Sequence, residues 1–123
     1  MKHETDRILL VEEDTTLADI TAFRLELSGY VVDVVHSAHD AFEAIDANIP
    51  DMIITDLVLP DIDGCEFISR LSDDKRSGHI PIMVFSTNAA LDQVERAYAA
   101  GAKQYLATPF DPMILDERVG ALL

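Results

Sequence analysis

The stretch PDMIITDLVLPDIDG, residues 50–64, decides the fold because it joins a short apolar run to a turn rich in acids. The run Met52–Ile54 shows no alternation of apolar and polar residues, which predicts a strand covered on both faces, as in a parallel sheet flanked by helices. It ends near Asp56, at the carboxyl edge where open α/β sheets bind ligands. Asp61 and Asp63 fit turn or N-cap positions before the next helix. We therefore expect Asp56 in a crevice above the sheet, the alternative being that it only caps a turn.

The remaining segments repeat this order of strand, polar edge and helix. Asp14 suits an N-cap, and Leu17, Ile20, Phe23 and Leu27 then recur at helical spacing. Strands are expected at residues 7–11, 30–35, 52–54, 80–85 and 103–107, and helices at 15–27, 38–47, around 67–71, around 91–98 and at 112–122. This alternation predicts one α/β domain over residues 1–123, a doubly wound parallel sheet with right-handed crossovers.

Composition narrows the class of protein. The chain has 123 residues and a formal net charge of -14. Such a surface repels nucleic acid phosphates and anionic lipids, so we expect no direct nucleic acid or membrane partner, although an acidic surface also serves solubility. No apolar run reaches membrane-spanning length, and a cytoplasmic protein is the default expectation. A single cysteine, Cys65, excludes an internal disulfide.

Polar residues follow four of the expected strands, and the carboxyl ends of parallel strands share one edge. These residues are Glu12, Glu13, Asp14, Asp56, Ser86, Thr87 and Thr108. Several carboxylates in one crevice repel each other unless a cation is bound or some are protonated. Oxygen ligands that are few in number favour Mg²⁺ before Ca²⁺. Alternatively, the acids at residues 12–14 only complement the positive end of the first helix.

The motifs LLVEED, TDLVLPDIDG, IPIMVFST, AGAKQYL and TPF occur in this order along the chain. Together they closely resemble the receiver (CheY-like) domain of bacterial two-component response regulators, over essentially the whole chain. The resemblance implies a flavodoxin-like five-stranded sheet of order 2-1-3-4-5. It also implies Mg²⁺-dependent phosphoryl transfer from a sensor histidine kinase or a phosphotransfer protein to one aspartate, and a downstream protein or output domain as the second partner.

The resemblance assigns roles to individual residues. Asp56 matches the aspartate that accepts the phosphoryl group, and Ser86 and Thr108 match the residues that contact that group. Tyr105 matches the aromatic residue that moves inward when the Ser86 hydroxyl is engaged. The implied metal ligands are Glu13 directly, Glu12 through water, Asp56, and the backbone carbonyl of Val58. Without the resemblance, Ser86 would be interpreted as a helix cap and Tyr105 as a half-buried strand residue.

Two positions depart from the family pattern. Thr108 stands where the family usually has a lysine, and Lys103 cannot replace it, because five strand residues separate their backbones by roughly 16 Å. A neutral hydroxyl is a weaker partner for a phosphoryl oxygen than an ammonium group. Glu13 stands where the family usually has an aspartate, and Mg²⁺ tolerates such a change of ligand geometry poorly.

Three functions compete on this basis. The first is a phosphorylatable receiver whose switching is weakened, a signalling domain with at most slow self-dephosphorylation rather than a turnover enzyme. The second is a pseudo-receiver, which binds partners or dimerises through the segments 91–98, 103–107 and 112–122 without phosphate. The third is a flavin protein or an aspartate-nucleophile hydrolase. Acids occupy the place of a phosphate-cradling loop after the first strand, which argues against a flavin.

Overall fold

The computed structural model describes residues 6–88 and 90–123, and in them strands and helices alternate strictly. The elements are β1 (Arg7–Val11), α1 (Thr15–Leu27), β2 (Val31–Val35), α2 (Ala38–Ala47), β3 (Met52–Thr55), α3 (Gly64–Asp73), β4 (Ile82–Ser86), α4 (Leu91–Ala100), β5 (Gln104–Ala107) and α5 (Pro112–Leu122). All pairs of neighbouring strands are parallel, and the sheet order is β2-β1-β3-β4-β5. The expected strand order is confirmed.

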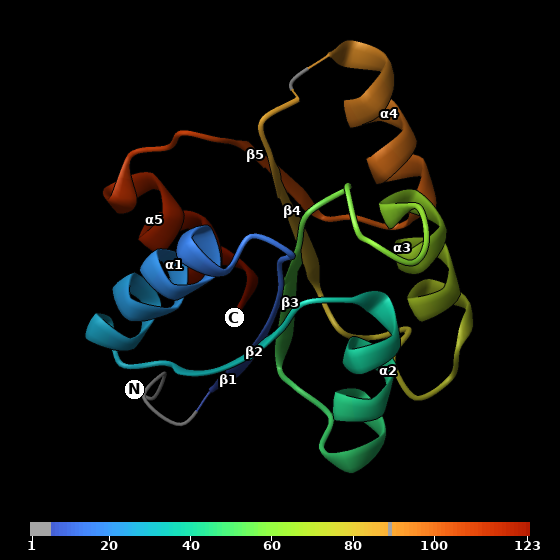
Figure 1. The fold of residues 1–123 in the computed structure, drawn as a ribbon, viewed down its shortest axis with the longest axis horizontal. Coiled ribbons are helices and arrows are strands. Elements are labelled where there is room, and N and C mark those ends of the chain that lie inside the picture. Colours follow the sequence, from blue (N-terminus) through green and yellow to red (C-terminus); the bar gives the residue numbers. More distant parts are fainter. Residues whose placement is uncertain (1–5, 89) are drawn as a thin grey trace.

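The sheet is covered on both faces. Figure 1 shows α1 and α5 on one side of it and α2, α3 and α4 on the other. Side chains alternate along each strand, so Ile8 and Leu10 pack into the core beneath α1 and α5, whereas Leu9 and Val11 pack beneath the other three helices. Because both faces are apolar, the strands show continuous apolar runs in the sequence.

Helix α1 begins and ends where the sequence predicts, but its apolar residues are distributed differently from what their spacing suggests. Asp14 Oδ1 accepts a hydrogen bond from the Leu17 N–H at 3.0 Å. Ile20, Phe23 and Leu27 are 63%, 62% and 65% exposed. The buried face consists instead of Ala18, Thr21, Ala22 and Leu25. The helix therefore has two apolar faces, and small side chains let the inner one pack close to the sheet.

Three expected strand starts shift by one or two residues. β2 begins at Val31, β5 at Gln104, and β4 at Ile82 rather than at residue 80. The N–H of Ile80 donates to the Ser77 carbonyl in a turn at 3.0 Å, and Pro81 has no N–H to donate. Only the Pro81 carbonyl joins the sheet, by accepting the N–H of Ile53.

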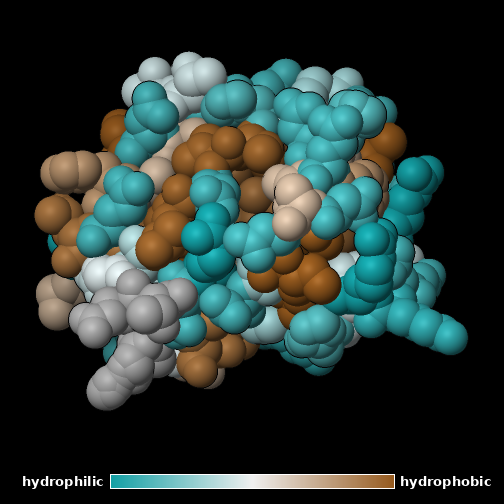
Figure 2. Space-filling view, turned by 90° about the horizontal axis from the view of Figure 1, so that it is seen from below, coloured by the Kyte–Doolittle hydropathy of each residue, from teal (hydrophilic) through white to brown (hydrophobic). Residues whose placement is uncertain are grey.

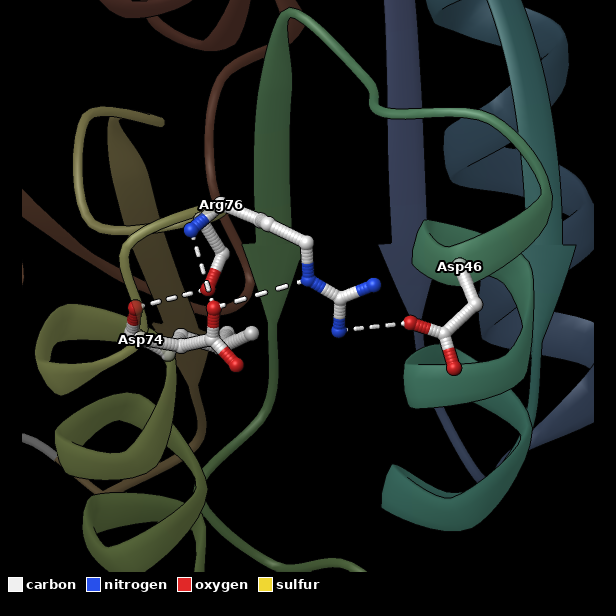
Figure 3. A network of polar contacts seen from close by, with 5 residues as sticks. Asp46, Asp74 and Arg76 are labelled. Atoms are coloured by element: carbon white, nitrogen blue, oxygen red, sulfur yellow. Dashed lines mark hydrogen bonds and ion pairs between the residues drawn. The ribbon is translucent and has the colours of Figure 1, made fainter.

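Arg76 links the loop after α3 to α2. Its Nη2 lies 2.7 Å from Asp46 Oδ1, and its Nε lies 3.6 Å from Asp74 Oδ1 (Figure 3). These side chains are about half exposed or more, so solvent screens the ion pairs and they contribute little to the stability of the fold.

On the face seen in Figure 2, hydrophobic side chains reach the surface in separate areas between hydrophilic ones. In the described part of the chain, no helix has the length and apolar character needed to cross a membrane.

Candidate functional site

The sheet brings the ends of β1, β3, β4 and β5 together at one edge. Thr55 is in register with Val11 on one side and with Val84 on the other, and Ser86 is in register with Ala107. The pairing continues past the strand ends: the N–H of Asp56 donates to the Val11 carbonyl at 3.2 Å. The N–H of Thr108 likewise donates to the Ser86 carbonyl at 2.8 Å. Residues far apart in sequence therefore begin their loops side by side.

Asp56 is held by the loop that it begins. Its Oδ1 accepts hydrogen bonds from the N–H of Leu57 at 2.6 Å and from the N–H of Val58 at 3.3 Å. The loop closes tightly because the Gly64 N–H donates to the Leu57 carbonyl at 2.9 Å. A Cβ on Gly64 would lie 2.4 Å from the Leu57 Cα, so only glycine permits this approach. The half-buried Asp56 carboxylate is consequently fixed in position.

Glu12 is the buried acid of the site, with 3% of its surface exposed. Its Oε2 accepts the N–H of Asp14 at 2.7 Å, whereas the buried Oε1 receives no hydrogen bond from any donor in the described residues. Burial raises the pKa of Glu12 to about 7, and the charge of Asp56 and a hydrogen bond with it add to the rise, while the Asp14 N–H opposes it. Without a cation, the Glu12 carboxyl group is therefore about half protonated near neutral pH.

The two remaining predicted metal-site residues lie on the surface. Glu13 is exposed beside Glu12, and no described residue forms a hydrogen bond or ion pair with its side chain. Val58 is exposed in the loop after Asp56, where it forms an isolated antiparallel bridge with Asp63. The structure thus brings Glu12 and Asp56 into direct interaction and leaves Glu13 at the rim of the crevice.

Ser86 and Tyr105 meet at the loop between β4 and α4. Ser86 is buried, and its Oγ accepts the N–H of Asn88 at 3.1 Å. The Tyr105 hydroxyl donates to the Asn88 carbonyl. Burial raises the pKa of Tyr105, a hydrogen bond with Ser86 acts against this rise, and the charge of Asp56 adds to it. Asn88 is not among the site residues expected from the sequence, although a Ser-Thr-Asn segment after a buried strand indicates a loop whose side chains form hydrogen bonds with its own backbone.

Thr108 lies at the same edge with a buried Oγ1 that has no hydrogen-bonding partner in the described part of the chain. In that part, no lysine or arginine forms an ion pair with Glu12, Glu13 or Asp56. Lys103 pairs through its backbone with Ile82 at the opposite end of β5. The described site therefore contains acids without a fixed positive charge.

Asp61 and Asp63 link the same loop to two helices, which the sequence reading missed. Asp61 Oδ1 and Oδ2 accept the N–H groups of Ala38 at 3.1 Å and of His39 at 2.8 Å, so Asp61 caps α2. Asp63 occupies the N-cap position of α3 but makes no side-chain cap bond there. Its Oδ2 lies 3.0 Å from Arg96 Nη2 on α4 instead. The sequence predicts turn or N-cap positions for both acids before this helix: both lie in the turn before α3, but only Asp63 takes the N-cap position, and the Asp61 carboxylate caps α2 because the loop folds back toward it.

Comparisons with known proteins agree on one family. A family model described as the response regulator receiver domain matches residues 8–120. The chemotaxis protein CheY1 of Helicobacter pylori is 31% identical, and the match covers 95% of this chain and 96% of CheY1. The DNA-binding dual master transcriptional regulator RpaA of Synechocystis is 33% identical, and the match covers 95% of this chain and 48% of RpaA. The chain thus spans about half the length of RpaA.

Solved structures give the same result. The crystal structure of a response regulator from Chloroflexus aurantiacus superimposes with a TM-score of 0.92 at 32% identity, covering 95% of this chain and 96% of that one. The receiver domain of a signal transduction histidine kinase from Syntrophus aciditrophicus superimposes with a TM-score of 0.90 at 27% identity, covering 97% and 90% of the two chains.

Proposed function

This chain belongs to the response regulator receiver domain family, and we propose that Asp56 accepts a phosphoryl group from a phosphohistidine of a sensor histidine kinase or phosphotransfer protein. In this transfer the P–N bond to the imidazole breaks, its electron pair stays on the ring nitrogen, and a P–O bond forms to an Asp56 carboxylate oxygen. The observation that carries the proposal is the pairing of buried Glu12 with Asp56 at the carboxyl edge of the sheet.

The donor set fits a hard divalent cation. Glu12 Oε1 is buried without a hydrogen-bond donor in the described residues, and the site holds no described cationic partner for its acids. A buried oxygen of this kind needs either a proton or a cation. The direct ligands would be the carboxylates of Glu13 and Asp56 and the Val58 carbonyl, and Glu12 would hold the ion through water. Bound Mg²⁺ would neutralise charge between the acceptor and the incoming phosphoryl group.

The loop after Asp56 fixes the attacking group. The N–H groups of Leu57 and Val58 hold Oδ1, which leaves the other carboxylate oxygen for bond formation. A carboxylate restrained in this way loses less freedom on reaction, and the same amides can donate to the new phosphoryl oxygens.

The response of the molecule would begin at Ser86. The added phosphoryl group brings roughly -1 to -2 charges to Asp56, by analogy with other phosphorylated side chains. Its oxygens compete for the Ser86 hydroxyl, which now contacts Asn88 and Tyr105. Because Tyr105 also binds the Asn88 carbonyl, movement of Ser86 would release the loop before α4. Side chains exposed on α4 and α5, among them Leu91, Tyr98 and Met113, form the surface through which a downstream partner or a dimer would respond.

The test is intact-protein mass spectrometry after incubation with acetyl phosphate, with and without Mg²⁺. We expect a gain of one phosphoryl group that requires Mg²⁺ and disappears in Asp56→Asn. Asp14→Asn is the matched control, because Asp14 lies at the same edge but caps α1. Modification that persists in Asp56→Asn would contradict the assignment of the acceptor.

The absence of a fixed cation beside Asp56 in the described chain favours a second candidate, a pseudo-receiver that binds partners without phosphate. It predicts an unchanged NMR spectrum when Mg²⁺ and beryllofluoride are added at millimolar concentrations. A receiver predicts shifts at Asp56, Ser86 and Tyr105 under the same conditions, and Asp56→Asn should abolish them.

A further inference from the structure

The loop between β3 and α3, residues 57–63, contacts two helices that it does not join. At the base of the loop, Val58 and Asp63 face each other in an isolated antiparallel bridge. The Asp61 carboxylate accepts two backbone N–H groups at the start of α2. The Asp63 carboxylate forms an ion pair with Arg96 of α4. The loop that follows the proposed acceptor is therefore a short closed hairpin, held on one side by α2 and on the other by α4.

Helix α4 buries little of its own surface. The structure describes every residue of α4, and Ala97 is the one that is buried. The neighbouring helix α3, in contrast, buries Phe67, Ile68 and Leu71 among others. The N-cap residue of α4, Ala90, forms no side-chain cap bond. A helix with so few buried apolar contacts opens at low free energy cost, so its position depends on the polar contacts that hold it.

The ion pair between Asp63 and Arg96 is such a contact. Arg96 Nη2 lies 3.0 Å from Asp63 Oδ2, and Arg96 Nη1 lies 3.5 Å from Gln93 Oε1 on the same helix. Arg96 is adjacent to Ala97, so the pair acts where α4 meets the core. The Asp63 carboxylate is available for it because it makes no cap bond to α3. The pair thus connects the middle of α4 directly to the loop 57–63.

We propose that Asp63 and Arg96 are positioning residues that couple the place of α4 to the affinity of the Asp56 site for Mg²⁺. Val58 lies opposite Asp63 in the hairpin, so a displacement of Asp63 also moves the Val58 carbonyl, a ligand in the proposed function. The inference rests on that proposed function and adds two residues that do not contact the ion. Coupling between two sites is reciprocal. A contact that moves α4 and separates the pair therefore weakens Mg²⁺ binding, and Mg²⁺ binding favours the paired position of α4.

The size and the sign of the effect follow from exposure and charge. The side chains of Arg96 and Asp63 are 52% and 50% exposed, so solvent screens the pair. Its loss should change the Mg²⁺ dissociation constant by about twofold to fivefold, the range open to an exposed ion pair. The chain has a net charge of -14, and removing the positive charge of Arg96 would, through space alone, strengthen the binding of a cation. A positioning role predicts the opposite, weaker binding.

NMR titration of the isotopically labelled protein with MgCl₂ measures the dissociation constant from the amide shifts of Leu57 and Val58. Arg96→Gln and Asp63→Asn should each raise this constant about twofold to fivefold. The double variant should raise it no further than either single change, because the same pair is lost in all three proteins. Asparagine is as good an N-cap residue as aspartate, so Asp63→Asn leaves the start of α3 intact.

Arg70→Gln is the matched control. Arg70 has a similar exposure and also forms an ion pair, but its partner Glu66 lies on the same helix, α3, so this variant should not raise the dissociation constant. If Arg96→Gln binds Mg²⁺ as tightly as wild type or more tightly, the inference is overturned while the proposed function stands. Effects of the two single changes that add up in the double variant would also overturn it. If the wild-type amides do not respond to Mg²⁺, the proposed metal site itself fails, and this inference fails with it.

Discussion

Replacing Glu12 by glutamine should stabilise the metal-free protein at neutral and alkaline pH. Protonated Glu12 accepts the Asp14 N–H and donates to Asp56, and a glutamine amide can make both bonds without a titrating proton. The buried carboxylate, in contrast, loses its proton as the pH rises. The substitution therefore preserves the shape and the hydrogen bonds and removes only the cost of ionisation.

The magnitude follows from the pKa, which is about 7 in the folded protein against a model value of 4.5. A folded pKa above the unfolded one means that the stability contribution is complete below pH 4.5 and is lost as the pH rises through 7. The difference corresponds to about 3 kcal/mol of unfolding free energy. Between pH 4.5 and pH 8, the unfolding free energy of wild type should thus fall by about 3 kcal/mol relative to that of Glu12→Gln.

Urea unfolding in EDTA at several pH values measures this difference. Glu13→Gln is the control, since it removes the same charge from an exposed neighbour and should change stability by less than about 0.5 kcal/mol. If Mg²⁺ binds as proposed, adding it at pH 8 should reduce the difference in unfolding free energy between wild type and Glu12→Gln. Stability curves for these two proteins that stay parallel from pH 5 to pH 8 would refute the reasoning.

Three further predictions concern packing and hydrogen bonding in and around the site. Gly64→Ala should lower the unfolding free energy by about 1–3 kcal/mol, because its Cβ would meet the Leu57 backbone. Gly120→Ala in α5 meets nothing within 4 Å and should raise it by up to about 1 kcal/mol. Denaturant unfolding compares the two variants, and equal effects would contradict the close contact at Gly64. By the same measurement, Phe67→Ala, which removes a fully buried ring, should lower the unfolding free energy by about 3–5 kcal/mol. Phe23→Ala should lower it by less than about 1 kcal/mol, because Phe23 is exposed. A large loss of stability in Phe23→Ala would show that the outer face of α1 is covered. Tyr105→Phe should cost about 1 kcal/mol and speed hydrogen exchange in the loop before α4, and unaltered exchange would show that the hydroxyl does not restrain it.

The sheet could be predicted from the sequence because its central strands β1, β3 and β4 are buried on both faces and so appear as continuous apolar runs. The strand order came from the resemblance to a family. The buried face of α1 could not be predicted from spacing alone, since apolar residues occur on both sides of the helix. Ile20 and Phe23 match the helical period as well as Ala18 and Ala22 do, and only packing against the sheet separates the two sets.

For the site, the sequence predicted which strand ends meet but not how the side chains interact there. Glu12 and Glu13 are adjacent identical residues just after the end of β1, and the fold buries the first and exposes the second. The partners of Asp61 and Asp63 depend on how the loop folds back over α2 and α4, which no local pattern encodes. The roles assigned to Asp56, Ser86, Tyr105 and the metal ligands stay predictions until phosphorylation and metal binding are measured.

The hydrogen bonds from the first turn of α2 to Asp61 give the loop after Asp56 a spectroscopic reporter on another element. The amide protons of Ala38 and His39 point at carboxylate oxygens that belong to this loop, five residues after Asp56. Their chemical shifts register any displacement of the loop, even though neither residue belongs to the acidic crevice. NMR measurement of these two amide resonances can therefore detect changes at Asp56 without a label or a substitution in the site.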